Sequence, residues 1–282
     1  MIRLSAFADE ISADLDEQVA ALRRENIHFL ELRGVWNTNV LDLTDQQIST
    51  IKQVLDAHDI GVSAIGSPIG KMPINSSFDE HLQRFERAIT LAQIFQAPFM
   101  RIFSFYPPVE AETSGESSAD QLEWREEALR RLRELTARAR AAHVILLHEN
   151  EKDIYGDTIA RCVDLLQSIN DDHFQAILDP ANFIQCGQIP YPDAYEAVQP
   201  WLRYVHVKDA QPDGSVVAPG EGAVRWPELL RRLRQDGYDG FFSLEPHLAT
   251  ASQFQGFSGP ELFRYASQSL QLMLQTMGWE YM

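Results

Sequence analysis

The sequence predicts a single (β/α)8 barrel, the TIM-barrel fold of the α/β class, over residues 1–282. Eight short β-rich segments recur along the chain, and helical patterns lie between them. The 282 residues, of which 45% are hydrophobic, suffice for one large core, and α/β barrels commonly reach this length as one domain. A doubly wound sheet is the alternative. It usually has fewer strands, and the first turn here, FADEIS, is not a glycine-rich phosphate loop.

The predicted strands are short and recur at intervals that leave room for a helix after most of them. In chain order they begin at Ile2, Ile27, Gly61, Phe99, His143, Phe174, Arg203 and Gly240, and they read IRLSAFA, IHFLELRG, GVSAIGS, FMRIFSF, HVILLHE, FQAILD, RYVHVKD and GFFSLEP.

The helical patterns have recognisable faces and starts. The segment LDEQVAALRREN places Leu15, Val19 and Leu22 on one apolar face. Three helix starts match the capping box, in which a Ser or Thr is followed three residues later by Glu or Gln. These pairs are Thr44 with Gln47, Ser77 with Glu80, and Ser118 with Gln121.

Three connections are too long or too rich in glycine to be simple turns. They follow the fourth, seventh and eighth strands and read YPPVEAETSGESSAD, AQPDGSVVAPGEGAV and PHLATASQFQGFSGP. Each follows the C-terminal end of a strand, which is the face where barrel enzymes build their active sites. We therefore expect these loops to build the site, with plain surface loops as the alternative.

The overall charge and the cysteines restrict the classes of partner. The chain has 24 Lys and Arg against 41 Asp and Glu, a net charge of −17, which disfavours binding to nucleic acid. No apolar run is long enough to cross a membrane, and the start, MIRLSAFADE, lacks the features of a signal peptide. Cys162 and Cys186 have neither metal nor disulfide spacing. We expect a cytoplasmic protein with a small-molecule substrate and no membrane partner; homo-oligomer formation is left open.

Four metal-ligating side chains fall at consecutive strand ends. Glu149, Asp179, His206 and Glu245 are separated by 30, 27 and 39 residues, each about one βα unit, so they should lie side by side on one rim of the barrel. Three carboxylates in one place would repel each other strongly unless a cation compensates them. Oxygen-rich ligation with one histidine suits Mn²⁺ or Mg²⁺, while Co²⁺ and Zn²⁺ are feasible. We predict one divalent metal ion with two coordination positions open for substrate or water.

Each of these residues has an ordinary structural explanation when taken singly. A lone carboxylate at a strand end commonly caps a helix or forms an ion pair, and a lone histidine is commonly a hydrogen-bonded core residue. A metal-free barrel that binds a sugar is therefore a further alternative. Their coincidence on four consecutive strand ends favours the metal.

Five motifs resemble those of the xylose isomerase-like TIM barrels, the sugar phosphate isomerase/epimerase group. They are LLHEN, ILDPANF, VHVKDA, PGEGAVRWPELL and GYDGFFSLEPH, and the resemblance extends from FADEIS to the last strand. It implies a divalent metal held by Glu149, Asp179, His206 and Glu245, with the two glutamates also serving as the acid/base pair in ketose epimerases. One position departs from the pattern, because ketose 3-epimerases have a substrate-binding histidine where this chain has Asn182.

Further residues are candidates for substrate binding: Glu31, Lys71, Arg101, Asn182 and Lys208. Lys208 belongs to VHVKD, which resembles the inosose dehydratase-like members. For Glu31 the alternative is an ion pair with Arg33 or Lys71. For Arg101 the alternative is an ion pair with Glu149. His148 should point away from Glu149 and serve packing. The candidates for apolar walls of the site are Trp36, Phe105, Phe254 and Phe257, with core packing as the alternative.

The leading functional prediction is an isomerase or epimerase of a keto sugar or related polyol ketone, acting through a metal-stabilised enediolate. A metal-dependent lyase, an inosose or 3-dehydroshikimate dehydratase, is the alternative, since it shares the first proton abstraction. DNA repair by an abasic-site endonuclease is disfavoured. That activity needs additional histidines for a trinuclear zinc site, and the third strand here ends in AIGS.

Overall fold

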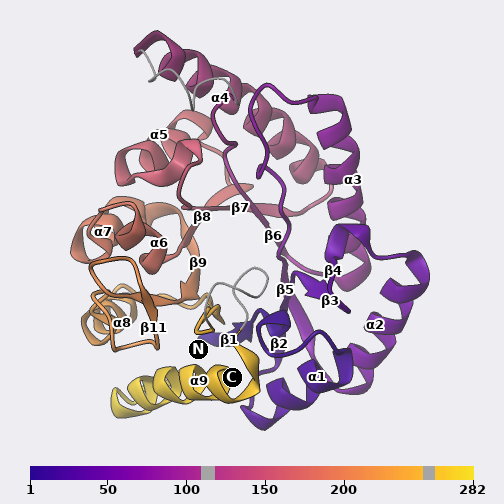
Figure 1. The fold of residues 1–282 in the computed structure, drawn as a ribbon, viewed down its shortest axis with the longest axis vertical. Helices are drawn as coiled ribbons and strands as arrows, with labels where there is room; N and C mark the ends of the chain where they lie inside the picture. The colour runs from indigo at the N-terminus through magenta and orange to yellow at the C-terminus, as the bar shows by residue number, and fades with distance from the viewer. Residues whose placement is uncertain (109–117, 250–257) are drawn as a thin grey trace.

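The chain folds into a closed barrel of parallel strands surrounded by helices, as the computed structural model shows (Figure 1). The structure describes residues 1–108, 118–249 and 258–282, with the backbone alone for 118–120. Around the barrel the strands follow the order β1-β12-β9-β8-β7-β6-β5-β2, and β2 pairs with β1 to close the ring. The predicted fold class is confirmed. The doubly wound alternative is wrong, because that fold has an open sheet with two unpaired edges, whereas this sheet is closed.

All eight predicted strands are present in the barrel. Their bounds are β1 Arg3–Ala6, β2 Phe29–Leu32, β5 Gly61–Ile65, β6 Phe99–Ile102, β7 Ile145–Glu149, β8 Phe174–Leu178, β9 Leu202–Val207 and β12 Phe241–Leu244. Two short antiparallel pairs lie outside the barrel: β3 Gly34–Val35 with β4 Thr38–Asn39, and β10 Asp209–Ala210 with β11 Val216–Val217.

Helices cover the outside of the barrel. Their bounds are α1 Leu15–Arg24, α2 Asp45–Ala57, α3 Phe78–Phe95, α4 Ser118–Ala141, α5 Ile159–Ile169, α6 Pro180–Gln185, α7 Tyr195–Val198, α8 Trp226–Gln235 and α9 Gly259–Thr276. Short 3-10 turns are η1 Ala8–Glu10, η2 Val40–Asp42, η4 Tyr155–Asp157 and η6 Gln199–Trp201, and a π turn is η5 Pro190–Ala194. The described part of the chain contains no helix that is both long and apolar enough to cross a membrane.

The predicted helix signals have physical counterparts. In α1, Leu15, Val19 and Leu22 are buried together, which confirms the predicted apolar face. Thr44 forms both halves of its capping box with Gln47 at the start of α2. At the start of α3 the Ser77 side chain accepts a hydrogen bond from the backbone N–H of Glu80. The side chain of Ser118 lies outside the described residues.

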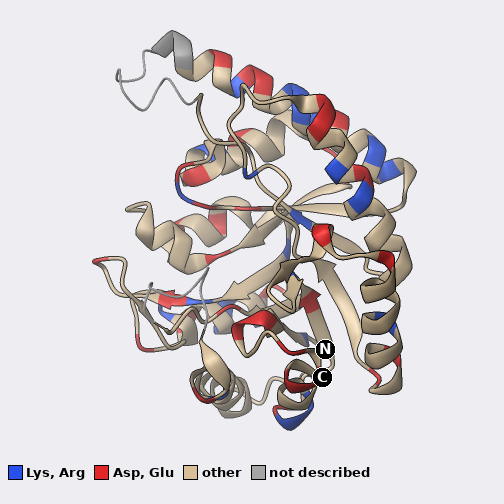
Figure 2. Cartoon of the chain, turned by 45° about the vertical axis from the view of Figure 1, so that its right-hand side comes forward, with Lys and Arg blue, Asp and Glu red and all other residues tan. Residues whose placement is uncertain are grey.

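The core has an outer and an inner part. The outer part lies between strands and helices, and the inner part fills the barrel with Ala64, Leu147, Ile177, Tyr204 and Phe241. Parallel pairing aligns all C-terminal strand ends at the same rim. Charged residues of both signs are mixed along the outer helices (Figure 2). This core therefore supports a rim at which polar side chains from distant parts of the chain meet.

Of the three long connections, only the one after β9 lies wholly within the described residues. There the buried Asp209 carboxylate accepts hydrogen bonds from the backbone N–H groups of Gly220, Gly222 and Val224. A Cβ on Gly222 would lie 2.2 Å from Asp209 Oδ1, so the close approach requires glycine. The loop is thus held firmly against the barrel rim. Residues 109–117 and 250–257 of the other two connections lie outside the described residues.

Candidate active site

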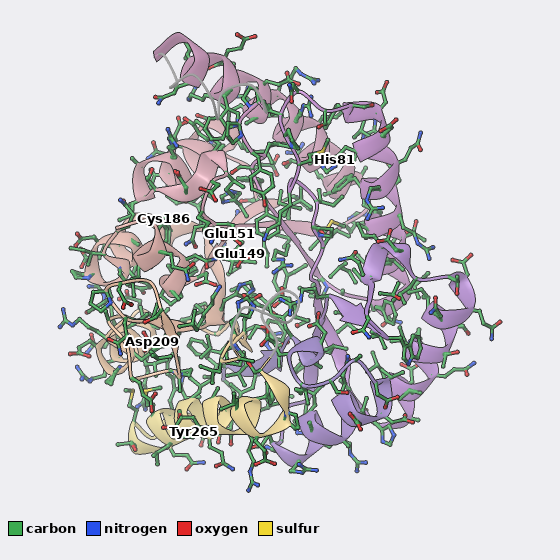
Figure 3. All side chains as sticks on the ribbon, viewed as in Figure 1. His81, Glu149, Glu151, Cys186, Asp209 and Tyr265 are labelled. Atoms are coloured by element: carbon green, nitrogen blue, oxygen red, sulfur yellow. The ribbon has the colours of Figure 1, made fainter. Side chains whose placement is uncertain are left out.

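Four strand ends bring the predicted metal ligands together near the centre of the barrel, where Figure 3 labels Glu149. Glu149 is the last residue of β7, and Asp179 follows β8 directly. His206 is the penultimate residue of β9, and Glu245 follows β12. The βα-unit spacing therefore does place the four residues on one rim.

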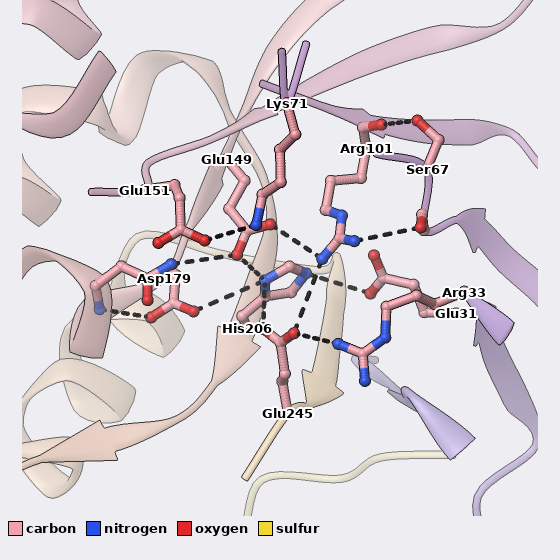
Figure 4. A network of polar contacts seen from close by, with 12 residues as sticks. Glu31, Arg33, Ser67, Lys71, Arg101, Glu149, Glu151, Asp179, His206 and Glu245 are labelled. Atoms are coloured by element: carbon pink, nitrogen blue, oxygen red, sulfur yellow. Dashed lines mark hydrogen bonds and ion pairs between the residues drawn. The ribbon is translucent and has the colours of Figure 1, made fainter. Parts of the chain in front are cut away.

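The donor atoms surround a common point. His206 Nδ1 lies 3.0 Å from Glu149 Oε1, 3.5 Å from Glu245 Oε2 and 3.9 Å from Asp179 Oδ2 (Figure 4). One donor atom from each of the four residues lies within 4.8 Å of all the others. Ligands at about 2.1 Å from one ion are about 3.0 Å apart at right angles and about 4.2 Å apart when opposite. The distances from His206 Nδ1 to the three carboxylates fall within this range, so the four residues could hold a single divalent cation.

A buried oxygen without a partner supports this fit. Glu245 Oε2 is buried and has no hydrogen-bond partner among the described residues. An uncompensated buried carboxylate oxygen costs several kcal/mol, so this position favours a bound cation. Three carboxylates and one imidazole nitrogen form the donor set that suits Mn²⁺, Mg²⁺ or Zn²⁺.

The local electrostatics differ between the carboxylates. Burial alone would raise the pKa of Glu149, but His206 and Arg101 outweigh this effect and hold the pKa at about 2. Burial raises the pKa of Asp179 to about 6; Lys208 opposes this rise, and Glu149 adds to it. Glu149 therefore ionises more readily than Asp179. An added positive charge would favour the ionised form of Asp179, whose pKa burial raises.

Arg101, which comes from β6, contacts both glutamates. Its Nη1 lies 3.2 Å from Glu149 Oε2 and 3.8 Å from Glu245 Oε1. Its Nη2 donates to the carbonyl oxygen of Gly66. The predicted pairing of Arg101 with Glu149 is thus present, and the guanidinium lies where it can also reach an oxygen of a ligand bound beside the two glutamates.

Arg33 contributes a second guanidinium that the sequence analysis did not assign to the site. Its side chain donates to Asp9 Oδ2 at 2.7 Å, to Glu10 Oε1 at 3.1 Å and to Glu245 Oε1 at 2.7 Å. His247 Nε2 approaches the same oxygens of Glu10 and Glu245, at 3.0 and 3.3 Å. Glu10, Glu245 and His247 also have metal-ligand spacing. Because Arg33 already neutralises two of these carboxylates, we assign no second metal there.

The charges around Glu245 lower its basicity. Burial alone would raise the pKa of Glu245, but His247, Lys208 and His206 outweigh it and lower the pKa well below its ordinary value. Its Oε1 faces Arg33 while its Oε2 faces His206. The two oxygens of Glu245 therefore have different surroundings. Oε1 contacts Arg33 and His247, whereas Oε2 has no hydrogen-bond partner among the described residues and is available to a metal.

Lys208 and Asn182 form a buried polar pair beside Asp179. Lys208 Nζ donates to Asn182 Oδ1 at 2.8 Å and lies 3.5 Å from Asp179 Oδ2. Asn182 Nδ2 donates to the carbonyl oxygen of Asn150 at 3.0 Å and lies 3.4 Å from Glu149 Oε1. Asn182 thus connects the lysine to the carboxylate cluster.

Lys71 lies at the outer edge of the site. Its ammonium pairs with Glu151 Oε2 at 2.9 Å and lies 4.3 Å from the ring centre of Phe103. The Lys71 side chain is 33% exposed, so it is the most accessible of the five predicted substrate-binding residues, since the other four are buried. It can reach a substrate group that enters from solvent.

Glu31 is completely buried in β2 and faces His206. Its Oε2 lies 3.3 Å from His206 Nε2. The alternative pairing with Arg33 or Lys71 is absent, since those two cations bond to other carboxylates.

Other predicted residues have structural roles. His148 is buried outside the cluster and its Nε2 lies 3.0 Å from Ser104 Oγ, consistent with packing. Phe105 is a core residue whose ring packs edge-on against His81, so for Phe105 the core-packing alternative holds. Trp36 is half-buried, and Phe254 and Phe257 lie outside the described residues.

Two surface hollows, of about 420 and 320 Å³, share Arg3 and lie at the opposite mouth of the barrel. Their walls include the first residues of several strands, such as Gly61 and Leu202. Barrel enzymes carry their chemistry at the other end, so these hollows are not candidates for the active site.

Comparisons with known proteins agree with this description. A family model for the xylose isomerase-like TIM barrel matches residues 19–273. A comparison with curated proteins finds no significant match. Among solved structures, the chain is similar to the probable 3-DHS dehydratase AsbF of Bacillus anthracis, which is involved in petrobactin synthesis. The TM-score is 0.74 and the identity 18%, over 96% of this chain and 99% of AsbF.

Two further structures have the same fold. A D-tagatose 3-epimerase-like protein is similar with a TM-score of 0.78 and 16% identity, over 98% of both chains. A xylose isomerase-like TIM barrel protein from Mycobacterium smegmatis, in complex with magnesium, has a TM-score of 0.71 and 18% identity, over 98% of this chain and 96% of that one. At these identities the similarity establishes the fold alone.

Proposed function

The chain belongs to the xylose isomerase-like TIM barrel family, and we propose that it is a divalent-metal-dependent isomerase or epimerase of a keto sugar or related polyol ketone. The observation that carries this proposal is the convergence of Glu149, Asp179, Glu245 and His206 Nδ1 on one point. These four residues would hold one ion, with Mn²⁺ or Mg²⁺ preferred and Co²⁺ or Zn²⁺ feasible. A divalent ion held there supplies Lewis-acid polarisation of a carbonyl and its neighbouring hydroxyl.

The two glutamates are the proposed acid/base groups. Each has one oxygen toward the donor cluster and one oxygen toward Arg101. Glu149 and Glu245 come from strands three apart in the ring, so they approach a bound substrate from different directions. One carboxylate removes the proton from the carbon beside the carbonyl, and the other returns a proton.

Cationic side chains orient the substrate. Lys208, Arg101 and Lys71 each carry N–H donors near the cluster, and we propose that they bind carbonyl and hydroxyl oxygens of the sugar. Asn182 and Glu31 are the other two residues predicted from the sequence to bind substrate. The Asn182 side chain is already hydrogen-bonded within the protein, and Glu31 is completely buried. The net charge of −17 disfavours nucleic acid as a partner and is compatible with a small polar substrate. We expect the protein to act in the cytoplasm.

A dehydratase is the second candidate, and the surroundings of Glu245 favour it. Elimination of water needs one carboxylate to remove a proton and a donor to assist the leaving hydroxyl, so two equivalent carboxylate bases are not required. Arg33 and His247 already occupy Glu245 Oε1, which leaves Glu149 Oε2 as the less restrained proton acceptor. Similarity to a probable 3-DHS dehydratase is consistent with this candidate.

One experiment separates the candidates. Purified protein loaded with Mn²⁺ is incubated in D₂O with free ketoses, inososes and 3-dehydroshikimate, and the products are followed by NMR and mass spectrometry. Deuterium at one carbon of a product of unchanged composition identifies an isomerase or epimerase, whereas a product lighter by one water identifies a dehydratase. Reaction at equal rates after complete metal removal would contradict both.

A further inference from the structure

Glu31 is a buried carboxylate without an ordinary partner. It is completely inaccessible to solvent, and neither of its oxygens has a hydrogen-bond partner of standard geometry among the described residues. A buried carboxylate in this situation is costly unless a positively polarised group compensates it. The group that faces it most closely must therefore explain its presence.

That group is the imidazole of His206. Glu31 Oε2 lies 3.3 Å from His206 Nε2, while Nδ1 on the other side of the ring faces Glu149, Asp179 and Glu245. Figure 4 shows Glu31 and Asp179 on opposite sides of the imidazole. His206 is itself completely buried, so its ring has no solvent partner.

The tautomer of His206 follows from these two contacts. A neutral imidazole carries its proton on one nitrogen and a lone pair on the other. A cation at the four-residue cluster needs the lone pair on Nδ1, so the proton must be on Nε2, where Glu31 can accept it. Pairing of a ligand histidine with a carboxylate fixes the ring orientation and raises the basicity of the ligand nitrogen.

We infer that Glu31 is a positioning residue that accepts the Nε2–H of His206 and thereby fixes Nδ1 as the metal-binding nitrogen. The inference rests on the metal site of the proposed function. It reassigns Glu31 from direct contact with substrate to support of a ligand. The side chain has no exposed surface through which to contact substrate, and its immediate neighbour is the imidazole.

The test compares Glu31→Gln with Ser63→Ala. Gln keeps the size of the side chain and removes its charge. Ser63 is also fully buried inside the barrel, where it bonds to Tyr204 and Ser5, so its loss disturbs the interior without removing a contact to His206. The affinity of each purified protein for Co²⁺ alone is measured by competition with a chromophoric chelator, and metal-free stability is measured by denaturant unfolding.

We expect Glu31→Gln to bind Co²⁺ roughly 10–100-fold more weakly than wild type, and Ser63→Ala to bind it as wild type does. Equal Co²⁺ affinity in Glu31→Gln and wild type would overturn this inference and leave the proposed function standing. If the KM for substrate were also raised, Glu31 would be a substrate-binding residue. A wild-type chain that binds no Co²⁺ would overturn the proposed function as well. The two failures are therefore distinguishable.

A second measurement needs no variant of Glu31. In Zn²⁺-loaded wild-type protein with ¹⁵N-labelled histidine, long-range NMR correlations report which ring nitrogen carries the proton. We expect His206 to show a protonated Nε2 and a zinc-bound Nδ1. Zinc on Nε2 would overturn the inference even if Glu31→Gln failed to fold.

Discussion

Arg33 Nη1 lies 2.7 Å from Glu245 Oε1, and this contact joins residues 212 positions apart in the sequence. The same guanidinium also bonds to Asp9 and Glu10, which are neighbours in η1, so one arginine compensates three carboxylates from two segments of the chain. The planar fork of arginine is suited to this task, whereas lysine offers a single point charge. The charge balance beside the proposed metal site therefore depends on Arg33.

The first prediction concerns this arginine. Arg33→Gln should lower the free energy of unfolding by about 3–5 kcal/mol, because it removes the guanidinium that buried Glu10 and Glu245 share. Denaturant unfolding at neutral pH measures the change. The control is Arg84→Gln, which removes a pair with Asp42 whose side chains are about half exposed and should cost about 1 kcal/mol or less. Equal losses in the two variants would show that the Arg33 network contributes no more than a surface pair.

The second prediction concerns the metal and Asp179. Purified protein should bind about one divalent ion, and Asp179→Asn should weaken binding by more than the roughly 10–100-fold loss typical of an outer-shell partner. The Asp179 side chain also caps α6 by accepting from the N–H of Asn182, and asparagine caps helices as well as aspartate does. The substitution therefore removes the ligand charge while it keeps the cap.

Calorimetric titration with Mn²⁺ measures this effect, with Asp14→Asn as the matched control. Asp14 caps α1 in the same way but lies outside the donor cluster. Asp14→Asn should bind Mn²⁺ as wild type does. Unchanged Mn²⁺ affinity in Asp179→Asn would argue against ligation by that residue.

The third prediction is a loss of stability in acid that involves His81. Burial, together with Arg131 and Arg84, lowers the pKa of His81 to about 4, and its Nε2 accepts a hydrogen bond from the N–H of Gly70. In the unfolded chain the pKa returns to about 6.5. The unfolded state therefore binds more protons between these values, and the contribution of His81 is complete above pH 6.5 and is lost as the pH falls toward 4, by about 1.4 kcal/mol per unit.

Denaturant unfolding at several pH values between 7 and 4 tests this. His81→Gln keeps an acceptor for the Gly70 N–H and does not titrate, so its stability should fall less steeply over this range than that of wild type. His81 belongs to α3 and not to the donor cluster, and Figure 3 labels it apart from Glu149, so metal binding should be unchanged. Parallel pH profiles for the two proteins would exclude His81 as the source.

The sequence predicts the barrel and the four convergent ligands for the same physical reason. In parallel βα units the C-terminal ends of strands share one rim, so residues about one unit apart, such as Glu149 and Asp179, become neighbours. Local signals also predict the Thr44 capping box correctly. These features depend on chain periodicity and local hydrogen bonding, both of which are visible in sequence.

Other parts of the site depend on contacts that sequence does not encode locally. Arg33 reaches Asp9 and Glu10 from another segment, and His247 reaches Glu10 across 237 positions. Phe105 has a φ of 69°, and its side chain is part of the core. From the sequence alone, an aromatic residue after a strand could equally face the site. Ser67 Oγ donates to the carbonyl oxygen of Arg101, 34 positions away, and this contact likewise forms only in the folded chain.

The last prediction concerns proton transfer by the two glutamates. In Glu149→Gln and Glu245→Gln an amide oxygen can still coordinate a metal, but the amide cannot accept a proton. Each variant should therefore keep part of its metal and lose most turnover, by roughly 10²–10⁴-fold. The control is Glu25→Gln, since Glu25 is also buried but pairs with Arg264 on the outside of the barrel.

The relative size of the two losses reports the reaction. Glu245 Oε1 already contacts Arg33 and His247, while Glu149 Oε2 contacts Arg101 alone at 3.2 Å. An epimerase that uses both faces of one carbon needs both carboxylates, so both variants should lose turnover and solvent deuterium should enter the product at that carbon. A dehydratase with Glu149 as its base should lose much more in Glu149→Gln. Full activity in Glu245→Gln, with metal content equal to that of wild type, would refute proton transfer by Glu245 and leave it as a ligand alone.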